Sequence, residues 1–556
     1  MQIVAQIEEN ILSDFRNFLF IVWKHLKLPD PTILQYEIAY WLQHGPKRQI
    51  VEAYRGIGKS WITSAYVLWR LLKDPNEKFL IVSASKQRSD DFSIFTQRLI
   101  TEMPILQHLA PTDDQRSSKI AFDVAPTRAA HAPSVKSVGV FGQMTGSRAT
   151  HIIADDVEVV NNSDTEDKRD KLLQTVLEFE AIIVPEVGRI TYLGTPQTEM
   201  SVYNKLRERG YECRIWTSRY PTLANLAKYE GFLAPSIYDA VTAEPELAGK
   251  PTDPLRFTEI DLLEREAAYG RTGFALQFML DTSLSDMLRF PLRTSDLIAL
   301  ECTGVKGPVA LGWASGLQQQ VKDLPNVGFT GDRLYRPMFI DEKWTDYEGA
   351  VMTIDPSGRG HDETGYAVVK QLHGTLYVTA SGGLQGGYEE PVLVRLANIA
   401  KDNAVKYIVV ESNFGDGMFS TILQPILARI YPCTIEEIRH NIQKERRIID
   451  TLEPVMNTHR LVIDLTVLKQ DLEYTDVRNS LLYQMTHITR DRGSLKHDDR
   501  LDALAMAVSY WVESMARDDT IAKKQHDSRL LDEELKNFVD GILGTRTNPN
   551  KWVKTR

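Results

Sequence analysis

The chain has 556 residues, of which 43% are hydrophobic and 25% charged, a length and balance typical of two or three globular domains. Its formal net charge of −10 argues against a protein that coats nucleic acid by bulk positive charge, although a local basic groove would still bind phosphates. The three cysteines lie far apart, no apolar run reaches membrane-span length, and the first residues lack a signal-peptide pattern. A disulfide framework, a zinc motif, a membrane protein and a secreted protein are therefore not expected.

Strand-like and helical patterns alternate through the first part of the chain, residues 1–215. Short apolar runs ending in polar turns predict strands at 48–54, 78–84, 150–156 and 188–195, and a helix is expected at 59–72. Such alternation predicts a parallel α/β sheet with its site at the carboxyl ends of the strands. We expect this part to be one domain, a P-loop ATPase of the ASCE type.

The pattern weakens over residues 216–347, where proline and glycine are frequent, and we expect a connecting region there. A second α/β pattern predicts a domain at 348–515. Its expected strands lie at 350–358, 364–372, 374–383, 406–413 and 461–465, and its last helix at 498–516. Residues 516–556 are charged and end in a basic stretch, which is typical of a tail.

A phosphate-binding loop is indicated by the sequence AYRGIGKS at 53–60, which follows a predicted strand and opens a predicted helix. The groups expected to face the phosphates are the helix N-terminus and the backbone N–H groups of Arg55, Gly56, Ile57 and Gly58. Lys59 would reach the β- and γ-phosphates of ATP, and the Ser60 hydroxyl would ligate Mg²⁺. Alanine at 53 replaces the first glycine of the full motif, so this loop alone does not decide the function.

A partner for this loop is the apolar run HIIADD at 151–156. Asp155, at the end of the predicted strand, would hold Mg²⁺ either directly or through water. Asp156 or Glu158 would orient the attacking water, and the sequence leaves that choice open. A turn-forming acid is the ordinary explanation of such a strand end, but a phosphate loop upstream requires an acid of this kind.

Four further residues fit an ATPase. Arg55 and Arg148 would supply positive charge to the γ-phosphate, within one chain or from a neighbouring subunit, although each could instead pair with a nearby acid. Thr195 ends a predicted strand and would sense the γ-phosphate, or would simply mark a turn. The amide of Gln35 would bond both edges of adenine, a weak indication by itself.

The second domain carries a spaced set of acids. Asp355 and Glu411 each end a predicted strand, and Asp498, Asp499 and Asp502 lie at the start of the last predicted helix. Asp499 and Asp502 are three residues apart and share one helical face. Carboxylates brought together in this way would hold two Mg²⁺ ions about 4 Å apart for phosphodiester cleavage. Three strands opening with an aspartate favour an RNase H-like fold.

With both sites placed, nearly the whole chain resembles the large terminase subunit of tailed bacteriophages, of the podophage type. The motifs that carry the resemblance are AYRGIGKS (53–60), SVGVFGQMTGSRATHIIADDVE (137–158), YLGTPQTEM (192–200), PTDPLRF (251–257), GFALQFML (273–280), DPSGRGHDETGYAV (355–368), VVESNFGDGMF (409–419), DTLEPV (450–455) and HDDRLDA (497–503). Their order and tandem pairing are more specific than any single motif.

The resemblance implies a motor that forms a ring, a homo-pentamer, on the portal of an empty procapsid and pumps concatemeric double-stranded DNA into it. The nuclease would cut the concatemer, and a small terminase subunit would help to select the DNA. ATP and Mg²⁺ are the implied cofactors, with Mn²⁺ able to substitute in the nuclease. The implied location is the host cytoplasm, with transient attachment to the procapsid, absence from the mature virion and no membrane. The basic tail resembles tails that dock on the portal.

Residue by residue, the resemblance matches Lys59 and Ser60 to the Walker A pair and Asp155 to the Walker B acid. It places Asp156 where the family often has glutamate, so Glu158 stays an alternative. Arg148 matches a trans-acting arginine. Among the nuclease acids it matches Asp355 and Glu411, with Asp499 ranked first as the third acid, then Asp502 and then Asp498.

Two other classes of function share some of these features. A helicase-nuclease of DNA repair or recombination would carry both sites, but the sequence shows no second motor domain of the kind that a monomeric helicase needs. A scaffold that only binds nucleotide would not need the acids at 355, 411 and 499. We therefore expect a DNA-translocating ATPase joined to a metal-dependent endonuclease.

Overall fold

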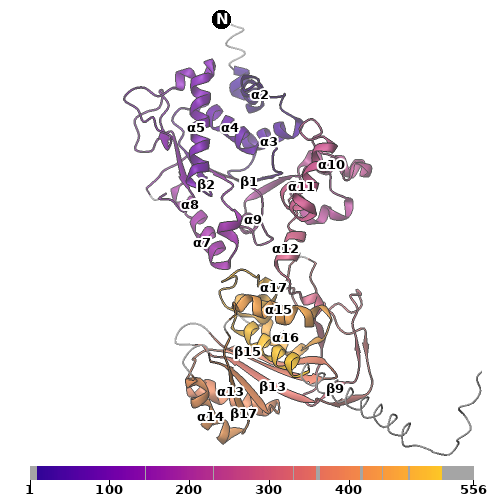
Figure 1. The fold of residues 1–556 in the computed structure, drawn as a ribbon. Coiled ribbons are helices and arrows are strands. Elements are labelled where there is room, and N and C mark those ends of the chain that lie inside the picture. Colours follow the sequence, from indigo (N-terminus) through magenta and orange to yellow (C-terminus); the bar gives the residue numbers. More distant parts are fainter. Residues whose placement is uncertain are drawn as a thin grey trace, which may run out of the picture. The chain divides into compact units, whose positions relative to one another are not determined.

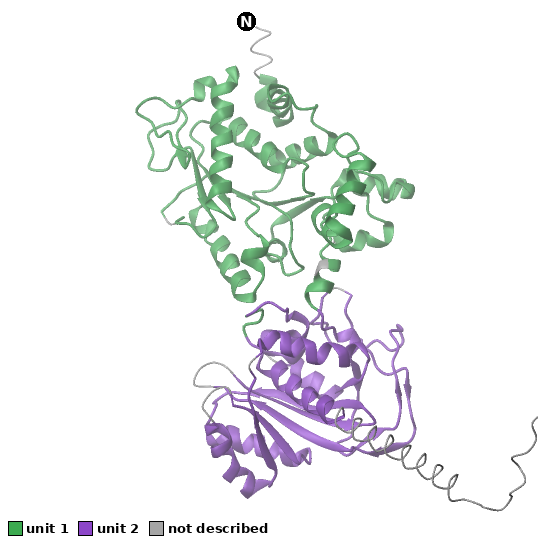
Figure 2. Cartoon of the chain, viewed as in Figure 1, with its two compact units in different colours: residues 1–290, 493–496 green, residues 291–492, 497–556 purple. Residues whose placement is uncertain are grey.

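The computed structural model describes residues 9–144, 146–229, 231–329, 331–357, 363–412, 417–440, 442–473 and 476–515. The chain divides into two compact units, residues 1–290 with 493–496, and residues 291–492 with 497–556 (Figure 2). Each unit contains one seven-stranded sheet. The predicted tail, residues 516–556, lies outside the described residues. Among the residues that are described, no helix is long and apolar enough to cross a membrane.

The sheet of the first unit has the strand order β3-β4-β2-β5-β6-β1-β7 (Figure 1). Its strands are β1 (Arg48–Ala53), β2 (Phe79–Ser83), β3 (Ala121–Phe122), β4 (Val135–Gly139), β5 (His151–Asp155), β6 (Arg189–Gly194) and β7 (Glu212–Trp216). All neighbours are parallel except β3, which is antiparallel to β4. Strand β6 lies between β1 and β5, as expected for an ASCE-type ATPase, so the carboxyl ends of the strands preceding the phosphate loop and Asp156 meet at one edge.

Helices cover this sheet, and its central strands are almost fully buried as a result. They are α2 (Phe15–His25), α3 (Ile33–His44), α4 (Lys59–Lys73), α5 (Lys86–Glu102), α6 (Val160–Ser163), α7 (Glu166–Leu177), α8 (Phe179–Ile182), α9 (Val202–Glu208), α10 (Pro235–Ala243), α11 (Glu259–Phe278) and α12 (Ser283–Arg289), with 3-10 turns at Pro104–Leu109, Leu223–Tyr229 and Pro245–Leu247. Helix α4 is buried on most of its circumference because β1 and other helices surround it. That burial fixes the start of α4, and with it the phosphate loop.

The sheet of the second unit has the order β17-β16-β13-β14-β15-β18-β8. Its strands are β8 (Ile298–Leu300), β13 (Gly349–Asp355), β14 (Thr364–Leu372), β15 (Thr375–Leu384), β16 (Tyr407–Glu411), β17 (Thr434–Ile438) and β18 (Leu461–Asp464). Strand β14 is antiparallel to β13 and β15, and the remaining pairs are parallel. The predicted three-strand opening followed by parallel strands is therefore observed.

Side chains alternate across β13 and so define the two faces of this sheet. Met352 and Ile354 pack with α13 and α14 in one apolar cluster. Thr353 points to the opposite face, where its hydroxyl donates to the Ala503 carbonyl at 2.5 Å. Asp355 has the same parity as Thr353 and so faces the helix formed by residues 499–515. The helices of this unit are α13 (Glu390–Asp402), α14 (Met418–Ile430), α15 (Lys444–Asn457), α16 (Leu465–Leu472) and α17 (Leu481–His487), with 3-10 turns at Thr294–Asp296 and Val477–Asn479.

The region predicted as a connection, residues 216–347, is divided between the two units at residue 290. Its first part contains α10, α11 and α12, and α11 continues past a kink at Gly270, where φ is 67°. Its second part contributes β8 to the nuclease-type sheet and two short ribbons. The ribbons pair β9 (Lys306–Pro308) with β12 (Trp344–Asp346), and β10 (Leu311–Gly312) with β11 (Phe339–Ile340).

Candidate nucleotide and metal sites

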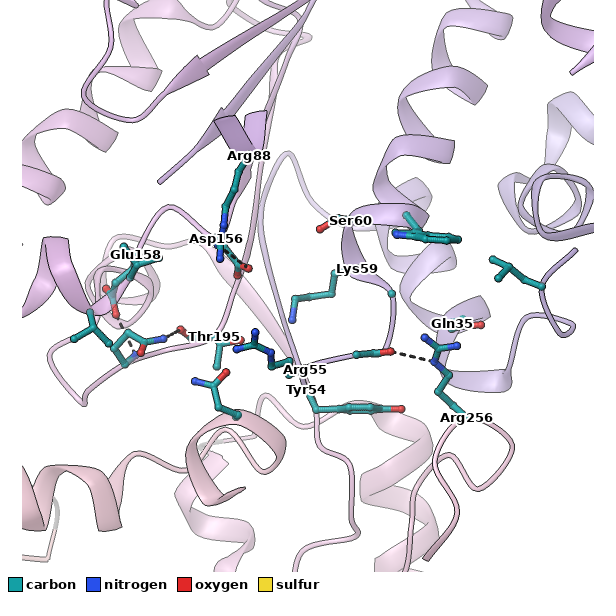
Figure 3. Close-up of a pocket in the computed structure, with 18 of the residues that line it drawn as sticks. Gln35, Tyr54, Arg55, Lys59, Ser60, Arg88, Asp156, Glu158, Thr195 and Arg256 are labelled. Carbon is teal, nitrogen blue, oxygen red and sulfur yellow. Dashed lines mark hydrogen bonds and ion pairs between the residues drawn. The ribbon is translucent and has the colours of Figure 1, made fainter. Parts of the chain in front are cut away.

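The phosphate loop joins the end of β1 to the start of α4 and borders a cavity of about 580 Å³ (Figure 3). Gly56 and Gly58 have φ of 96° and 99°, a left-handed conformation that favours glycine. A Cβ atom on Gly56 would lie 2.8 Å from Phe257 Cζ, so the backbone of the loop packs directly on that ring. The two glycines thus let the backbone turn and place its N–H groups beside the helix N-terminus.

Lys59 and Ser60 occupy the first turn of α4 at the cavity. The Lys59 amine donates to the Ala53 carbonyl and so folds back over the loop. Burial lowers the pKa of Lys59, an effect that Asp156 and Asp155 oppose. A lysine held close to the loop by its own carbonyl can exchange that contact for a phosphate oxygen.

Asp155 at the end of β5 faces Ser60 across the site. Its Oδ2 accepts from the Ser60 hydroxyl at 2.8 Å, and within the described chain its buried Oδ1 has no hydrogen-bond partner. Burial, followed by repulsion from Asp156, raises the pKa of Asp155 to about 7. A buried carboxylate oxygen without a partner beside a hydroxyl is a donor set that fits Mg²⁺.

Asp156 and Glu158 both line the cavity but differ in their surroundings. Asp156 has a φ of 45° and lies 3.8 Å from a guanidinium nitrogen of Arg88, and both side chains are partly exposed. Glu158 is 3% exposed, and its two oxygens accept from the N–H groups of Gln197 and Val202 and from the Ser201 hydroxyl at 2.6–3.1 Å. The carboxylate of Glu158 is thus engaged by the chain, whereas that of Asp156 faces the cavity.

Gln35 lies at the cavity with both ends of its amide engaged. Its Oε1 accepts from the Thr32 N–H at 3.1 Å in a capping box, and its Nε2 donates to the Ile57 carbonyl at 2.7 Å. The side chain is 3% exposed. The predicted contact with adenine therefore competes with the cap of α3 and with the contact that fixes the phosphate loop to α3.

Of the two predicted arginines, Arg55 lines the cavity and Arg148 does not. Arg148 precedes β5, and its side chain donates to the Ala181 carbonyl at 2.8 Å. Asp155 is at the other end of that five-residue strand, which spans roughly 13 Å at ~3.3 Å per residue. The sheet therefore places Arg148 at the edge opposite the nucleotide site of its own chain. Thr195 also lines the cavity.

The cavity also contains residues that the sequence analysis did not select, Arg88 and Arg256 among them. Arg256 donates to the Gly56 carbonyl at 3.0 Å, and Asp253 accepts from the Thr32 hydroxyl at 2.6 Å. These residues belong to the motif PTDPLRF in the predicted connecting region. The contact of Arg256 with the loop and that of Asp253 with the N-cap of α3 each span about 200 residues, so no local pattern could reveal them. Arg88 is one of many polar residues on α5.

In the second unit, Asp355 and Glu411 end the neighbouring parallel strands β13 and β16, so their side chains meet at one edge of the sheet. Asp502, in the helix of residues 499–515, completes a group whose ligand oxygens all lie within 4.8 Å of one another. Asp355, Glu411 and Asp502 are all buried, at 9%, 8% and 0% exposure. Three buried carboxylates from three elements fit a hard divalent cation.

The predicted order of the third acid differs from this geometry. Asp499, ranked first on sequence, is at the start of the helix and outside the group of three, whereas Asp502, one turn later, is inside it. The carbonyl of Asp498 accepts from the Asp502 N–H at 2.9 Å, so Asp498 begins the helix. Three-residue spacing puts Asp499 and Asp502 on one face, but only the docking of the helix on β13 decides which of them is nearer to Asp355.

Two cations from α15 lie against these acids. Lys444 is 3.2 Å from Asp355 and 3.1 Å from Asp502, and Arg447 donates to both oxygens of Asp502 at 2.7 and 2.9 Å. Burial raises the pKa of Asp355 and of Glu411, an effect that the neighbouring carboxylates strengthen and these cations oppose. Lys444 and Arg447 thus supply the positive charge that allows these acids to lie close together in the described structure.

Comparisons with known proteins bear on the whole chain. A family model described as the Ribonuclease H-like domain of the bacteriophage T7 terminase matches residues 354–461, which include Asp355 and Glu411. The chain is 45% identical over 549 residues to the large terminase subunit of Enterobacteria phage T3, an alignment that covers 97% of this chain and 93% of that protein. This chain belongs to the large terminase subunit family. The predicted family and its two fold types are thereby confirmed.

Solved structures of other terminases are more distantly similar to this large terminase subunit. The large terminase of a thermophilic bacteriophage is 12% identical, with a TM-score of 0.29, over 87% of this chain and 99% of that one. The nuclease domain of the large terminase subunit of bacterial virus Sf6 is 16% identical, with a TM-score of 0.22, over 30% of this chain and 90% of that one. Because these TM-scores are low, the family assignment rests on the similarity to the phage T3 protein.

Proposed function

We propose that this large terminase subunit hydrolyses ATP in its first unit to move double-stranded DNA through a portal into a procapsid, and cuts concatemeric DNA in its second unit. The observation that carries the proposal is the presence of both sites on one chain of this family, each built at the carboxyl ends of parallel strands. A helicase-nuclease receives no comparable support, because the sheet of the second unit is of the RNase H type and not a second motor.

In the motor, we assign the phosphates of ATP to the loop 55–58 and to Lys59. Ser60 and Asp155 would hold Mg²⁺, consistent with the buried, unpartnered Oδ1 of Asp155 in the described structure. When bound, Mg²⁺ neutralises charge on the β- and γ-phosphates. Arg55 adds positive charge from the same chain.

Asp156 is our candidate for the carboxylate that orients the attacking water. It faces the cavity beside Arg88, whereas Glu158 is buried and accepts three hydrogen bonds that would be lost if it turned towards the nucleotide. A buried carboxylate that loses its donors is destabilised by about 1–3 kcal/mol or more. Glu158 therefore serves better as a positioning residue for the loop that carries Thr195 and Gln197.

Arg148 would act on the nucleotide of a neighbouring subunit, because its own sheet separates it from Asp155. This arrangement requires a ring or another closed oligomer, for which the homo-pentamer expected of the family is our proposal. The remaining expected partners, namely the portal of the procapsid and a small terminase subunit, are proposed on the same ground, as is a location in the host cytoplasm.

In the nuclease, we assign metal binding to Asp355, Glu411 and Asp502, with Mg²⁺ as the cation and Mn²⁺ as its substitute. Bound divalent cations supply Lewis-acid stabilisation of the charge that develops on the phosphodiester. Lys444 and Arg447 hold the carboxylates in place in the metal-free protein. For a metal ion to bind, the side chains of Lys444 and Arg447 must release some of their contacts with these carboxylates.

A pair of single substitutions tests the two assignments together. Lys59→Ala should lower ATP hydrolysis at least about 100-fold and leave plasmid cleavage in Mn²⁺ unchanged, because it removes only a phosphate contact. Asp355→Ala should lower cleavage at least about 100-fold and leave ATP hydrolysis unchanged. Each variant is the control for the other, measured by phosphate release and by plasmid nicking. If Lys59→Ala hydrolyses ATP at the wild-type rate, or Asp355→Ala still nicks, the corresponding site lies elsewhere.

A further inference from the structure

One loop of the first unit is held from two sides by buried carboxylates. The loop of residues 195–202 follows β6 and begins in the nucleotide cavity with Thr195 (Figure 3). On one side Glu158 binds its Gln197 N–H and the N-terminus of α9. Glu158 comes three residues after Asp155, so this first contact ties the loop to the strand that carries the proposed Mg²⁺ acid.

The other side of the loop is held by Asp286 of α12. Asp286 Oδ2 accepts from the Glu199 N–H at 3.0 Å, and the side chain of Asp286 is 2% exposed. Burial raises the pKa of this carboxyl to about 7, against the stabilising effect of the Thr282 hydroxyl and the Glu199 N–H. Within the described residues its other oxygen, Oδ1, is buried without a hydrogen-bond partner, so the bond from the Glu199 N–H helps to offset the cost of burying this carboxyl.

Helix α12 is the last helix of the first unit before the chain enters the second unit, so a contact between Asp286 and the loop also affects the segment that joins the units. It ends at Arg289, and the chain passes into the second unit at residue 291. Arg289 also donates to the Asp164 carbonyl at 2.8 Å, next to the start of α7. The side chains of Leu284, Met287 and Leu288 are exposed, so few apolar contacts hold the outer face of α12. The hydrogen bonds of Asp286 and Arg289 therefore help to hold α12 in place, beside its packing on α11.

We propose that Asp286 is a positioning residue that couples the 195–202 loop to α12, so that a change at Thr195 on nucleotide binding or hydrolysis is passed to the segment leading out of the motor. The inference rests on the proposed function, because it takes the cavity to be the ATP site. Asp286 is not among the residues that line the cavity, so it acts on the loop and not on the nucleotide. The hydrogen bond joins the side chain of Asp286 to the backbone N–H of Glu199, so it acts on the backbone of the loop.

Hydrogen–deuterium exchange of the full-length chain, with and without a non-hydrolysable ATP analogue, tests the coupling directly. In the wild-type protein the analogue should change the exchange of both 195–202 and 283–289. In Asp286→Ala it should change the loop alone, because the acceptor for the Glu199 N–H is gone. Asp286→Asn, whose amide oxygen can accept the same N–H, should keep part of the response of α12.

The matched control is Asp281→Asn. Asp281 is an acid just before α12 that pairs with Lys228 at 2.7 Å and accepts the Ser283 N–H at the start of α12 at 3.0 Å. Asparagine removes the charge, but its amide oxygen can still accept the Ser283 N–H, so Asp281→Asn should leave the response of α12 intact. Activity assays on the same variants add a second measurement. The Asp286→Ala protein should keep its rate of ATP hydrolysis without DNA, and the length of DNA packaged per ATP hydrolysed should fall about tenfold. If the Asp286→Ala protein does not fold, the Asp286→Asn protein takes its place in the test, and its α12 should respond to the analogue less than α12 of the wild type.

Three outcomes separate the possibilities. If α12 of the Asp286→Ala protein still responds to the analogue as in the wild type, the coupling is refuted. If Asp286→Ala is as inactive in ATP hydrolysis as Lys59→Ala while remaining folded, Asp286 serves hydrolysis itself, and the proposal is also refuted. If the ATP analogue changes the exchange of neither segment in the wild-type protein, and does not protect residues 53–60 either, the assignment of the cavity to ATP fails. That outcome says nothing against the contact of Asp286 with the loop.

Discussion

At the scale of single residues, the third nuclease acid shows what a sequence can and cannot specify. Helical spacing predicts that Asp499 and Asp502 share a face, but it does not predict which of the two lies nearer to Asp355. The choice between them depends on where the helix rests on β13, which is fixed by contacts such as that of Thr353 with the Ala503 carbonyl. Asp355 and Glu411 were predictable because parallel neighbouring strands bring their ends together.

The same distinction gives a test on the nuclease. Asp502→Asn should weaken Mn²⁺ binding and lower DNA cleavage at least about 100-fold, because it removes one of three clustered carboxylates. Asp499→Asn, a matched loss of one charge on the same helical face, should lower cleavage less than about tenfold. Mn²⁺ titration by calorimetry and plasmid nicking measure the two effects. If Asp499→Asn lowers Mn²⁺ affinity and DNA cleavage as much as Asp502→Asn does, or more, Asp499 is a metal ligand after all.

The direction of the pH dependence follows from the same carboxyls. Burial and mutual repulsion raise the pKa of Asp355 and Glu411 in the metal-free protein, so they keep their protons to higher pH than ordinary acids. A metal ion binds the deprotonated form and must displace those protons. Mn²⁺ affinity should therefore fall as the pH is lowered from about 8 to about 6, which the same titrations would show.

At the scale of elements, the strands beside the nucleotide cavity were predicted well, whereas β3, β4 and β7 of the same sheet were not predicted. Strands β1, β5 and β6 lie within a residue or two of their predicted bounds, because each is a short apolar run buried on both faces. Strand β8 was missed because it has three residues and pairs with β18, about 160 residues later.

The support of the phosphate loop by α3 gives a test at this scale. Gln35→Ala removes the bond to the Ile57 carbonyl and half of the capping box, and should raise the KM for ATP about tenfold with a smaller change in kcat. A loosened loop binds the phosphates less tightly but still presents Lys59. Steady-state ATPase kinetics measure the change.

Gln43→Ala is its control, because Gln43 lies on the same helix and bridges two backbone groups in the same way, the Phe15 N–H and the Ser13 carbonyl, away from the loop. It should cost stability without raising KM. If both substitutions leave KM unchanged while Gln35→Ala discriminates less between ATP and GTP, Gln35 contacts the base after all.

At the scale of the whole molecule, the order of the motifs was the part of the function that the sequence specified best. Each motif is weak alone, but a phosphate loop, a strand ending in Asp155 and a later set of acids in this order predicted the family that the similarity to the phage T3 protein establishes. The predicted boundaries were less specific. The region predicted as a connection is divided at residue 290, because α10, α11 and α12 belong to the first unit and β8 pairs with β18 in the sheet of the second.

The measurement that most directly tests the account is packaging of double-stranded DNA into purified, portal-bearing procapsids by this protein with the small terminase subunit, ATP and Mg²⁺. DNA protected from added nuclease should accumulate with the wild-type chain and not with Lys59→Ala. Asp355→Ala should package linear DNA but fail to cut concatemers. If the wild-type chain hydrolyses ATP and cleaves DNA yet protects none of it, the two activities serve some process other than packaging.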